Sequence, residues 1–225
     1  LMEHFSRLGH NLHLAAPDDC PVTAEKLQPL QVVWHKLPLD QRFCRPAQRC
    51  LADILLNEKI DLLHTHGIRG GYHGRCALVR AKKQGAGTKS VYTVHGFHPA
   101  YYASFLLRRG VCYLEKRLFL RFTDCIIFVS ESDRKAFQRH VHLDSELLER
   151  RSALIPNGIH YLKPENLPDR RMCRKMLGLS PESYVVGTAS RLNYQKAVHL
   201  LIQAAAKLMN HELPRLEVLI AGDGP

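Results

Sequence analysis

The sequence lacks a C-x-x-C pair, a long low-complexity tract and an apolar run of membrane-spanning length. A spanning helix needs about 20 consecutive apolar residues, and no such stretch occurs. Only 14 Gly and 12 Pro are present among 225 residues, which excludes collagen-like and low-complexity chains. With 45% hydrophobic and 24% charged residues, the chain can bury a core of one large or two modest domains.

The cysteines are odd in number and widely spaced. Seven are present, so neither a disulfide framework nor a zinc ribbon is expected, and free thiols in a reducing compartment fit better. The first residues carry no basic segment followed by an apolar run, as a secretory signal would. We therefore expect a cytoplasmic protein.

Charge of one sign dominates, with 32 Lys and Arg against 21 Asp and Glu. The excess of +11 favours anionic partners such as nucleic acid, acidic lipid or phosphorylated substrates. Nucleic acid is not expected, because no recognised motif or aromatic platform accompanies the charge. Basic segments near residues 108–121 and 170–175 are either solvated helix faces or a surface that contacts an anionic membrane. In the second interpretation the protein lies on the inner face of the cell membrane, through Arg108 and Arg109 beside Tyr101, Tyr102, Phe105, Leu106 and Leu107.

Short apolar runs alternate with helical periodicity along most of the chain. Strands are predicted at residues 11–16, 60–64, 90–95, 125–129, 153–155, 184–189 and 216–221, and helices at 1–8, 46–58, 106–122, from 130 onward and 196–208. A further helix is predicted to end near Lys83, after a Gly-rich turn with Gly67, Gly70 and Gly71. Apolar strands separated by helices predict an α/β fold with doubly wound parallel sheets covered on both faces. We expect a Rossmann-like domain at residues 1–160, a linker with a basic helix at 161–180, and the start of a second Rossmann-like domain at 181–225.

The best-defined candidate binding site contains two cations. Arg191 follows a predicted strand, and Lys196 lies five residues later at the predicted start of a helix. Ligands of open α/β sheets bind at the carboxyl ends of strands, and a helix N-terminus flanked by cations suits a diphosphate. The alternative, a solvated turn whose basic residues bind nothing specific, stays open on spacing alone.

Seven segments in order resemble glycosyltransferase family 4. They are Leu8-Gly9-His10-Asn11-Leu12, Asp61-Leu62-Leu63-His64-Thr65-His66-Gly67, Tyr92-Thr93-Val94-His95-Gly96, Phe128-Val129-Ser130-Glu131-Ser132, Ile155-Pro156-Asn157-Gly158-Ile159, Ala189-Ser190-Arg191-Leu192 with Lys196, and Leu219-Ile220-Ala221-Gly222-Asp223-Gly224-Pro225. The resemblance implies a GT-B fold, with the second Rossmann-like domain truncated. It implies transfer of a sugar from a nucleotide-diphosphate donor to a glycan, lipid-linked or lipopolysaccharide-type acceptor, with retention of anomeric configuration.

The resemblance also implies roles for individual residues. Arg191 and Lys196 correspond to the ligands of the donor phosphates, and His95 to a histidine that orients the acceptor or the donor sugar by hydrogen bonding. The other residues assigned to the cleft are Gly96, Ser130, Glu131, Asn157, Gly158 and Gly222. No metal or cofactor is required, because cations and helix dipoles can meet the charge of the leaving diphosphate.

The sequence departs from the family at two positions and at both ends. Ala197 stands where the family usually has glycine after its lysine, and Ser190 stands where glycine usually precedes the arginine. The first strand with its Gly-rich loop would lie before Leu1, and a carboxylate pair after Pro225. We therefore expect these 225 residues alone to transfer no sugar.

Three alternatives accompany this interpretation. His64, His66, His95 and His98 gather at the ends of two predicted strands and suggest zinc, but ordinary hydrogen-bonded histidines are the expected interpretation because no carboxylate or cysteine lies at matching spacing. A different GT-B enzyme, such as a nucleotide-sugar 2-epimerase, would need acid/base carboxylates that the sequence does not identify. A degenerate transferase that serves as a noncatalytic binding module is the third.

Overall fold

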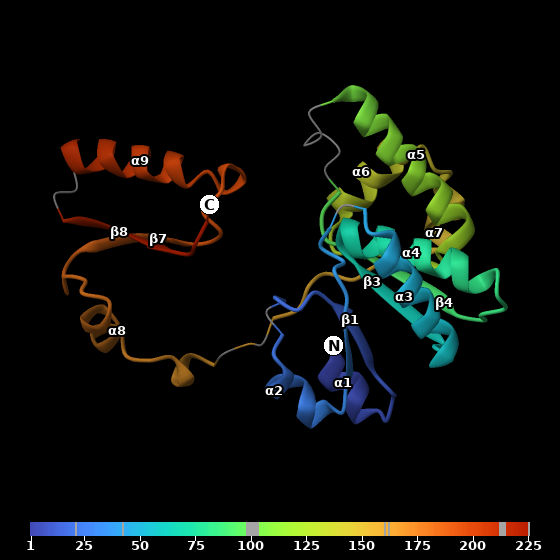
Figure 1. Cartoon of the computed structure of the whole chain (residues 1–225). Helices are drawn as coiled ribbons and strands as arrows, with labels where there is room; N and C mark the ends of the chain where they lie inside the picture. Colours follow the sequence, from blue (N-terminus) through green and yellow to red (C-terminus); the bar gives the residue numbers. More distant parts are fainter. Residues whose placement is uncertain are drawn as a thin grey trace. The chain divides into compact units, whose positions relative to one another are not determined.

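The computed structural model describes residues 1–20, 22–41, 43–97, 104–159, 161, 163–211 and 215–224. The chain divides into two compact units, Leu1–Gly158 and Ile159–Pro225. Each unit has parallel β-structure of its own (Figure 1). No helix within the described ranges is both long enough and apolar enough to cross a bilayer.

The first unit contains a four-stranded parallel sheet, in the order β3-β4-β5-β6, and a separate parallel pair, β1-β2. Its strands are β1 His13–Ala16, β2 Val33–Lys36, β3 Leu62–His66, β4 Lys89–Val94, β5 Cys125–Phe128 and β6 Ser152–Leu154. Its helices are α1 Met2–Arg7, α2 Ala24–Leu27, α3 Arg45–Asn57, α4 Gly67–Lys82, α5 Phe105–Phe122, α6 Glu131–Val141 and α7 Ser145–Arg150, with a 3-10 turn at Gln28–Leu30. The predicted α/β fold with parallel sheets is confirmed.

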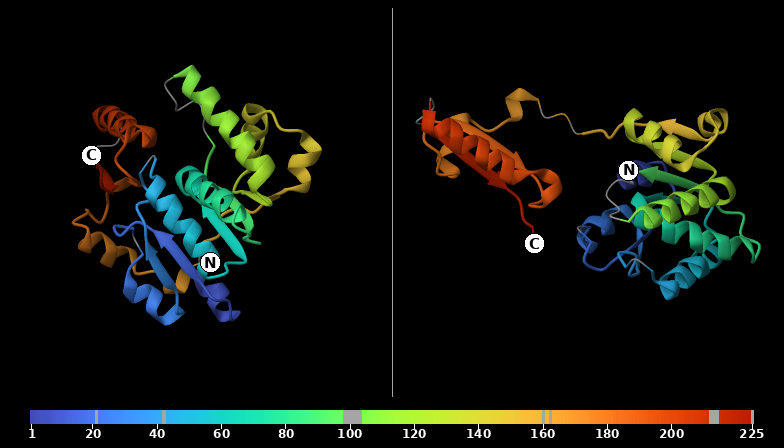
Figure 2. Two further views of the ribbon diagram at one scale, coloured as in Figure 1. Left: turned by 45° about the vertical axis from the view of Figure 1, so that its right-hand side comes forward. Right: turned by 90° about the horizontal axis from the view of Figure 1, so that it is seen from above.

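Two apolar clusters hold the first unit together. One joins β4 and β5 to α5, α6 and α7, with the Phe137 ring edge-on to Phe97, Phe119 and Phe128. The other joins α3 to α4, which lie side by side in Figures 1 and 2. Leu62, the first residue of β3, is 53% exposed.

A buried ion pair links α4 to α5. Arg75 is fully buried, and its Nη2 atom lies 2.9 Å from both carboxylate oxygens of Glu115. The guanidinium also donates from Nε to the Gly71 carbonyl at 2.7 Å and stacks 4.2 Å above the Tyr92 ring. Gly71 is required at this crossing, because a Cβ there would overlap the Tyr92 ring.

The second unit is one βαβ motif preceded by a basic helix. Its elements are a 3-10 turn Pro164–Asn166, α8 Arg170–Met176, β7 Tyr184–Ala189, a 3-10 turn Tyr194–Lys196, α9 Val198–His211 and β8 Leu216–Ala221. The strands β7 and β8 pair in parallel, and α9 packs against β8. The prediction that a helix begins at Lys196 is wrong. Asn193 caps a separate 3-10 turn there, and Ala197 adopts a left-handed φ of 51° that interrupts the helix before Val198.

Candidate functional site

Three imidazoles gather at the carboxyl ends of β3 and β4. His66 is the last residue of β3 and pairs in register with Thr93, while His95 directly follows β4. The Nδ1 atom of His66 lies 3.0 Å from Nε2 of His95, and their rings are stacked with centroids 5.3 Å apart. His64, two residues earlier on the same face, bonds the Thr93 hydroxyl through Nε2 at 2.8 Å. The parallel register therefore joins His95 to a histidine that the sequence assigned to no catalytic role.

Two imidazoles of the cluster, those of His64 and His66, favour the uncharged form. Partial burial, together with repulsion from His64 and His95, lowers the pKa of His66 to about 4. Burial and then His95 also lower the pKa of His64. At neutral pH the 3.0 Å contact is thus a hydrogen bond in which a neutral His66 either donates to His95 or accepts from it. Such a pair can bind sugar hydroxyls through ring nitrogens that donate or accept hydrogen bonds.

The loop after His95 is fixed by α6. Gly96 has a φ of 108°, which favours glycine, and the buried Phe97 N–H donates to the Asp133 carboxylate at 2.9 Å. Ser130 is the N-cap of α6, since its hydroxyl accepts from the Asp133 N–H at 3.1 Å and donates to the Asp133 carboxylate at 2.7 Å. Ser130 therefore caps α6 and holds the residue that fixes the His95 loop.

Sequence reasoning missed Asp133 as part of this site. The detectable signal was the S-x-x-D spacing that begins with Ser130, which is a capping-box pattern. Glu131, assigned to the cleft, is half exposed on α6 and lies 3.9 Å from both Arg134 and Lys135. It is thus engaged in exposed ion pairs of its own helix.

Asn157 and Gly158 lie in the exposed segment after β6, at the end of the first unit. No hydrogen bond within the described ranges joins either residue to the histidine cluster. His98, one of the four histidines considered for zinc, lies outside the described residues, as do Tyr101 and Tyr102. Within the described part of the chain, no three or more His, Cys, Asp or Glu side chains are arranged to hold a metal ion.

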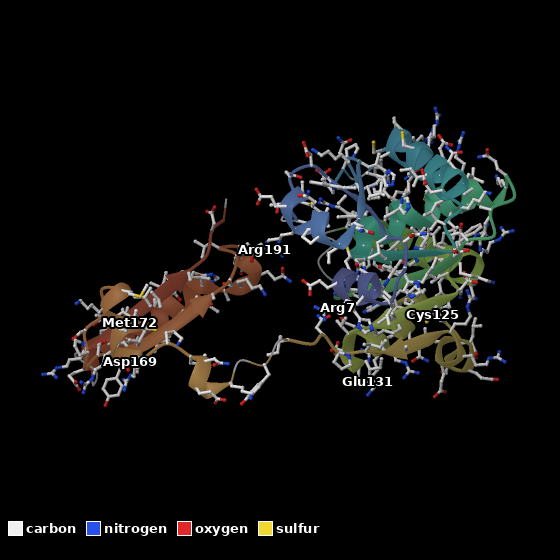
Figure 3. The ribbon with its side chains drawn as sticks, turned by 90° about the horizontal axis from the view of Figure 1, so that it is seen from below. Arg7, Cys125, Glu131, Asp169, Met172 and Arg191 are labelled. Atoms are coloured by element: carbon white, nitrogen blue, oxygen red, sulfur yellow. The ribbon has the colours of Figure 1, made fainter. Side chains whose placement is uncertain are left out.

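The donor-phosphate candidates lie in the second unit. Arg191 is exposed just after β7, at the loop end of the unit in Figure 3. The backbone beside it is fixed, because Ser190 N–H donates to Ala221 at 3.0 Å and Leu192 N–H donates to Asp223 at 2.9 Å. Gly222 and its neighbour Gly224 permit this close approach.

A Cβ at Gly222 would overlap the Ser190 carbonyl, and one at Gly224 would overlap the Leu192 carbonyl. Gly222 is thus tied by backbone geometry to the segment that carries Arg191. Lys196 is exposed at the end of the 3-10 turn that precedes α9, and its backbone N–H donates to the Asn193 side chain at 3.2 Å. Among the described residues, neither the Arg191 guanidinium nor the Lys196 ammonium forms a hydrogen bond or an ion pair.

Comparison with known proteins places this architecture among sugar transferases. The model of glycosyltransferase family 4 matches residues 1–161. A Bacillus subtilis (strain 168) protein, EpsD, assigned as a glycosyltransferase, is 26% identical over 226 residues that cover 98% of this chain and 56% of EpsD. The Escherichia coli UDP-Gal:alpha-D-GlcNAc-diphosphoundecaprenol alpha-1,3-galactosyltransferase is 29% identical over 179 residues that cover 77% of this chain and 43% of that enzyme. The chain thus spans about half the length of these curated relatives.

Solved structures show the same fold. Anabaena HepE in complex with UDP and glucose matches with a TM-score of 0.68 at 20% identity, over 96% of this chain and 62% of HepE. Its complex with UDP-glucose matches with a TM-score of 0.69 at 20% identity, over 95% of this chain and 61% of HepE.

Proposed function

The chain belongs to glycosyltransferase family 4, and on that premise we propose that the protein transfers a sugar from a nucleotide-diphosphate donor to a glycan or lipid-linked acceptor. The transferred sugar retains its anomeric configuration. The protein acts at the inner face of the cell membrane, where lipid-linked acceptors are presented.

One observation carries the proposal. Arg191 follows the carboxyl end of β7, Lys196 ends the 3-10 turn before α9, and both residues are exposed. An arginine can bind two phosphate oxygens at once, and a lysine adds a compact charge nearby. As the bond to the sugar breaks, negative charge develops on the leaving diphosphate, and fixed cations stabilise that charge. The charge is thereby met by residues of the chain, without a divalent cation.

The relatives support both substrates by name. HepE has been crystallised with UDP-glucose, and the E. coli relative uses UDP-Gal and a diphosphoundecaprenol-linked acceptor. These names favour a transferase over a nucleotide-sugar 2-epimerase or a noncatalytic binding module. We extend to this chain only the shared chemistry, a nucleotide-diphosphate sugar and a glycan or lipid-linked acceptor.

His95 orients the acceptor or the donor sugar in this proposal. Its Nε2 is engaged with His66 at 3.0 Å, so Nδ1 is the ring nitrogen left for a sugar hydroxyl. The partner on Nε2 fixes which tautomer His95 adopts, and hence whether Nδ1 donates or accepts. In this proposal His95 acts by hydrogen bonding and not as a nucleophile.

The experiment is an NMR titration of the 225-residue chain with UDP, followed through backbone amide shifts. We expect shifts concentrated at residues 190–197. Arg191→Ala and Lys196→Ala should each weaken binding roughly tenfold, because a hydrogen bond to a charged group contributes about 1.5–3 kcal/mol.

The matched control is the pair of variants Arg170→Ala and Lys175→Ala, which remove the same charges from exposed positions on α8. These should leave UDP affinity within about twofold, since distant exposed charges are screened. Equal losses from both pairs, or no shifts at residues 190–197, would show that these two cations are not the phosphate ligands.

A further inference from the structure

A pocket between α3 and α4 is lined mainly by arginines. The two helices lie side by side in the first unit (Figure 1). The pocket has a volume of about 290 Å³ and is lined by Arg45, Gln48 and Arg49 of α3 and by Cys76 and Arg80 of α4. Gln48 and Cys76 are half-buried, whereas the three arginines are exposed. None of the residues assigned above to donor or acceptor binding lines this pocket.

The three arginines of the pocket have no counter-ion. Among the described residues, Arg45, Arg49 and Arg80 form no ion pair and donate no side-chain hydrogen bond, and no carboxylate lines the pocket. Like charges that line one pocket repel one another, and an anion bound between them would remove that repulsion. Another pocket of the first unit contains both Lys59 and Asp61, so its charges balance. The arginine pocket therefore favours an anionic ligand.

The two half-buried residues add no negative charge to the pocket. Burial raises the pKa of the Cys76 thiol, so the thiol keeps its proton at neutral pH. Nε2 of Gln48 lies 3.1 Å from Nδ1 of the buried His73, whose Nε2 donates to the Gln41 carbonyl at 2.8 Å. Because that carbonyl only accepts, Nε2 carries the ring proton and Nδ1 accepts from the Gln48 amide. These bonds fix the orientation of Gln48 and join the start of α3 to α4.

We propose that this pocket binds the phosphate or diphosphate group of a small soluble compound. An arginine has five N–H donors and can bind two phosphate oxygens at once. Three arginines offer more donors than the two oxygens of a carboxylate can accept, whereas phosphate groups provide more oxygens and more charge. The lining contains no aromatic ring that would stack on a nucleobase, so the anion itself is the recognised group. The inference goes beyond the proposed sugar transfer, because the pocket shares no residue with that site.

The experiment is an NMR titration of the 225-residue chain with inorganic pyrophosphate, followed through backbone amide shifts. We expect saturable shifts at residues 45–49 and 76–80, with an affinity that falls as the salt concentration rises. Pyrophosphate can also bind the donor-phosphate candidates, so the titration is repeated in the variant Arg191→Ala/Lys196→Ala. The shifts at residues 45–49 and 76–80 should persist there unchanged. Their loss in that variant would overturn the proposal.

Removal of the pocket arginines should weaken this binding. Arg49→Gln should lower the affinity for pyrophosphate about tenfold, and the triple variant Arg45→Gln, Arg49→Gln and Arg80→Gln should abolish the saturable shifts. Arg49→Lys keeps the charge but loses the paired N–H groups, so it should recover only part of the affinity. Full recovery by lysine would contradict the proposal, because general positive charge would then suffice.

The matched control removes three exposed arginines of α5 and α6 that do not line the pocket, in the triple variant Arg117→Gln, Arg121→Gln and Arg139→Gln. Its affinity should stay within about twofold of the wild type, because distant exposed charges are screened. Circular dichroism checks that each variant is folded. Equal losses from the two triple variants, or no saturable shifts at the pocket, would overturn the proposal.

A second arm tests whether the phosphate comes from a lipid. The chain is sedimented with vesicles that contain phosphatidic acid, with and without the three pocket arginines. If pyrophosphate binds the pocket in the absence of vesicles, the soluble source is supported. If the arginines are needed only for sedimentation with vesicles and pyrophosphate does not bind, the ligand is a lipid and the proposal is wrong.

Discussion

Removal of Glu115 tests the cost of leaving the buried Arg75 charge without its partner in the ion pair between α4 and α5. In Glu115→Leu the fully buried Arg75 guanidinium loses both of its 2.9 Å carboxylate contacts. Arginine does not lose its proton in proteins, so the charge stays buried without a counter-ion. Breaking a buried pair in this way costs about 3–5 kcal/mol of the free energy of unfolding. That loss is a large fraction of the free energy of unfolding of a small domain.

Removing Arg75 should cost less free energy of unfolding than removing Glu115. In Arg75→Met the buried Glu115 carboxylate can escape its charge by taking up a proton, which limits the cost. Lowering the pH should therefore raise the free energy of unfolding of Arg75→Met relative to that of Glu115→Leu. The double variant Arg75→Met/Glu115→Leu leaves no buried charge, and we expect its stability to be near that of the wild type or above it.

Urea unfolding followed by Trp34 fluorescence is the assay. Trp34 is the single tryptophan of the sequence and belongs to the first unit, so its signal reports on that unit. The control cycle uses Glu146→Leu and Arg150→Met on α7, a pair 3.6 Å apart whose side chains are 79% and 69% exposed. Exposed pairs contribute less than about 1 kcal/mol. Equal coupling energies in the two cycles would refute the reasoning.

Three further predictions concern single positions. The pKa of His66, measured by NMR, should lie near 4 and should rise in His95→Ala; because this pKa is depressed by folding, the free energy of unfolding should fall as the pH drops from about 6.5 toward 4. Gly71→Ala should cost about 1–3 kcal/mol in urea unfolding, because its Cβ would overlap a buried tyrosine ring, whereas Gly70→Ala has open space and should stabilise α4 by about 0.5–1 kcal/mol. Ala197→Gly should stabilise the second unit by about 1 kcal/mol in a thermal scan, since a φ of 51° is strained for alanine; an unchanged midpoint would contradict that strain.

The long elements of the fold are predictable from the sequence because each has a strong local signal. Pro46 fits the start of α3, and Ser130 marks the N-terminus of α6 through its side-chain oxygen. Gly9 follows α1 with a positive φ of 81°, as a helix terminator should. The continuous apolar run of β5 identified that strand, because the strands of a parallel sheet are buried.

Elements with weak local signals were missed. The strand β2 has only four residues and is half exposed, so its pattern does not stand out from a loop. The helix α7 has six residues and one buried side chain, Leu148, although Asp144 caps it. The beginning of α9 was misplaced because alanine itself does not indicate a left-handed backbone; the glycine that the family usually has at position 197 was the available signal. The contact between His66 and His95 depends on strand register, which residue patterns alone do not fix.

Phosphate binding at Arg191 can be lost in two ways, by removal of its charge or by displacement of its backbone, and the structure offers a separate variant for each. Arg191 lies between two backbone hydrogen bonds, from Ser190 to Ala221 and from Leu192 to Asp223, so the position of its Cα depends on main-chain pairing rather than on its own side chain. Charge removal at Arg191 should therefore weaken phosphate binding without unfolding the motif. Gly222→Ala would instead force the Ser190 carbonyl away and displace Arg191 while its charge remains. If phosphate binding needs only local positive charge, the glycine variant will bind normally; if it needs a fixed guanidinium, both variants will lose affinity, and only the glycine variant will also lose stability.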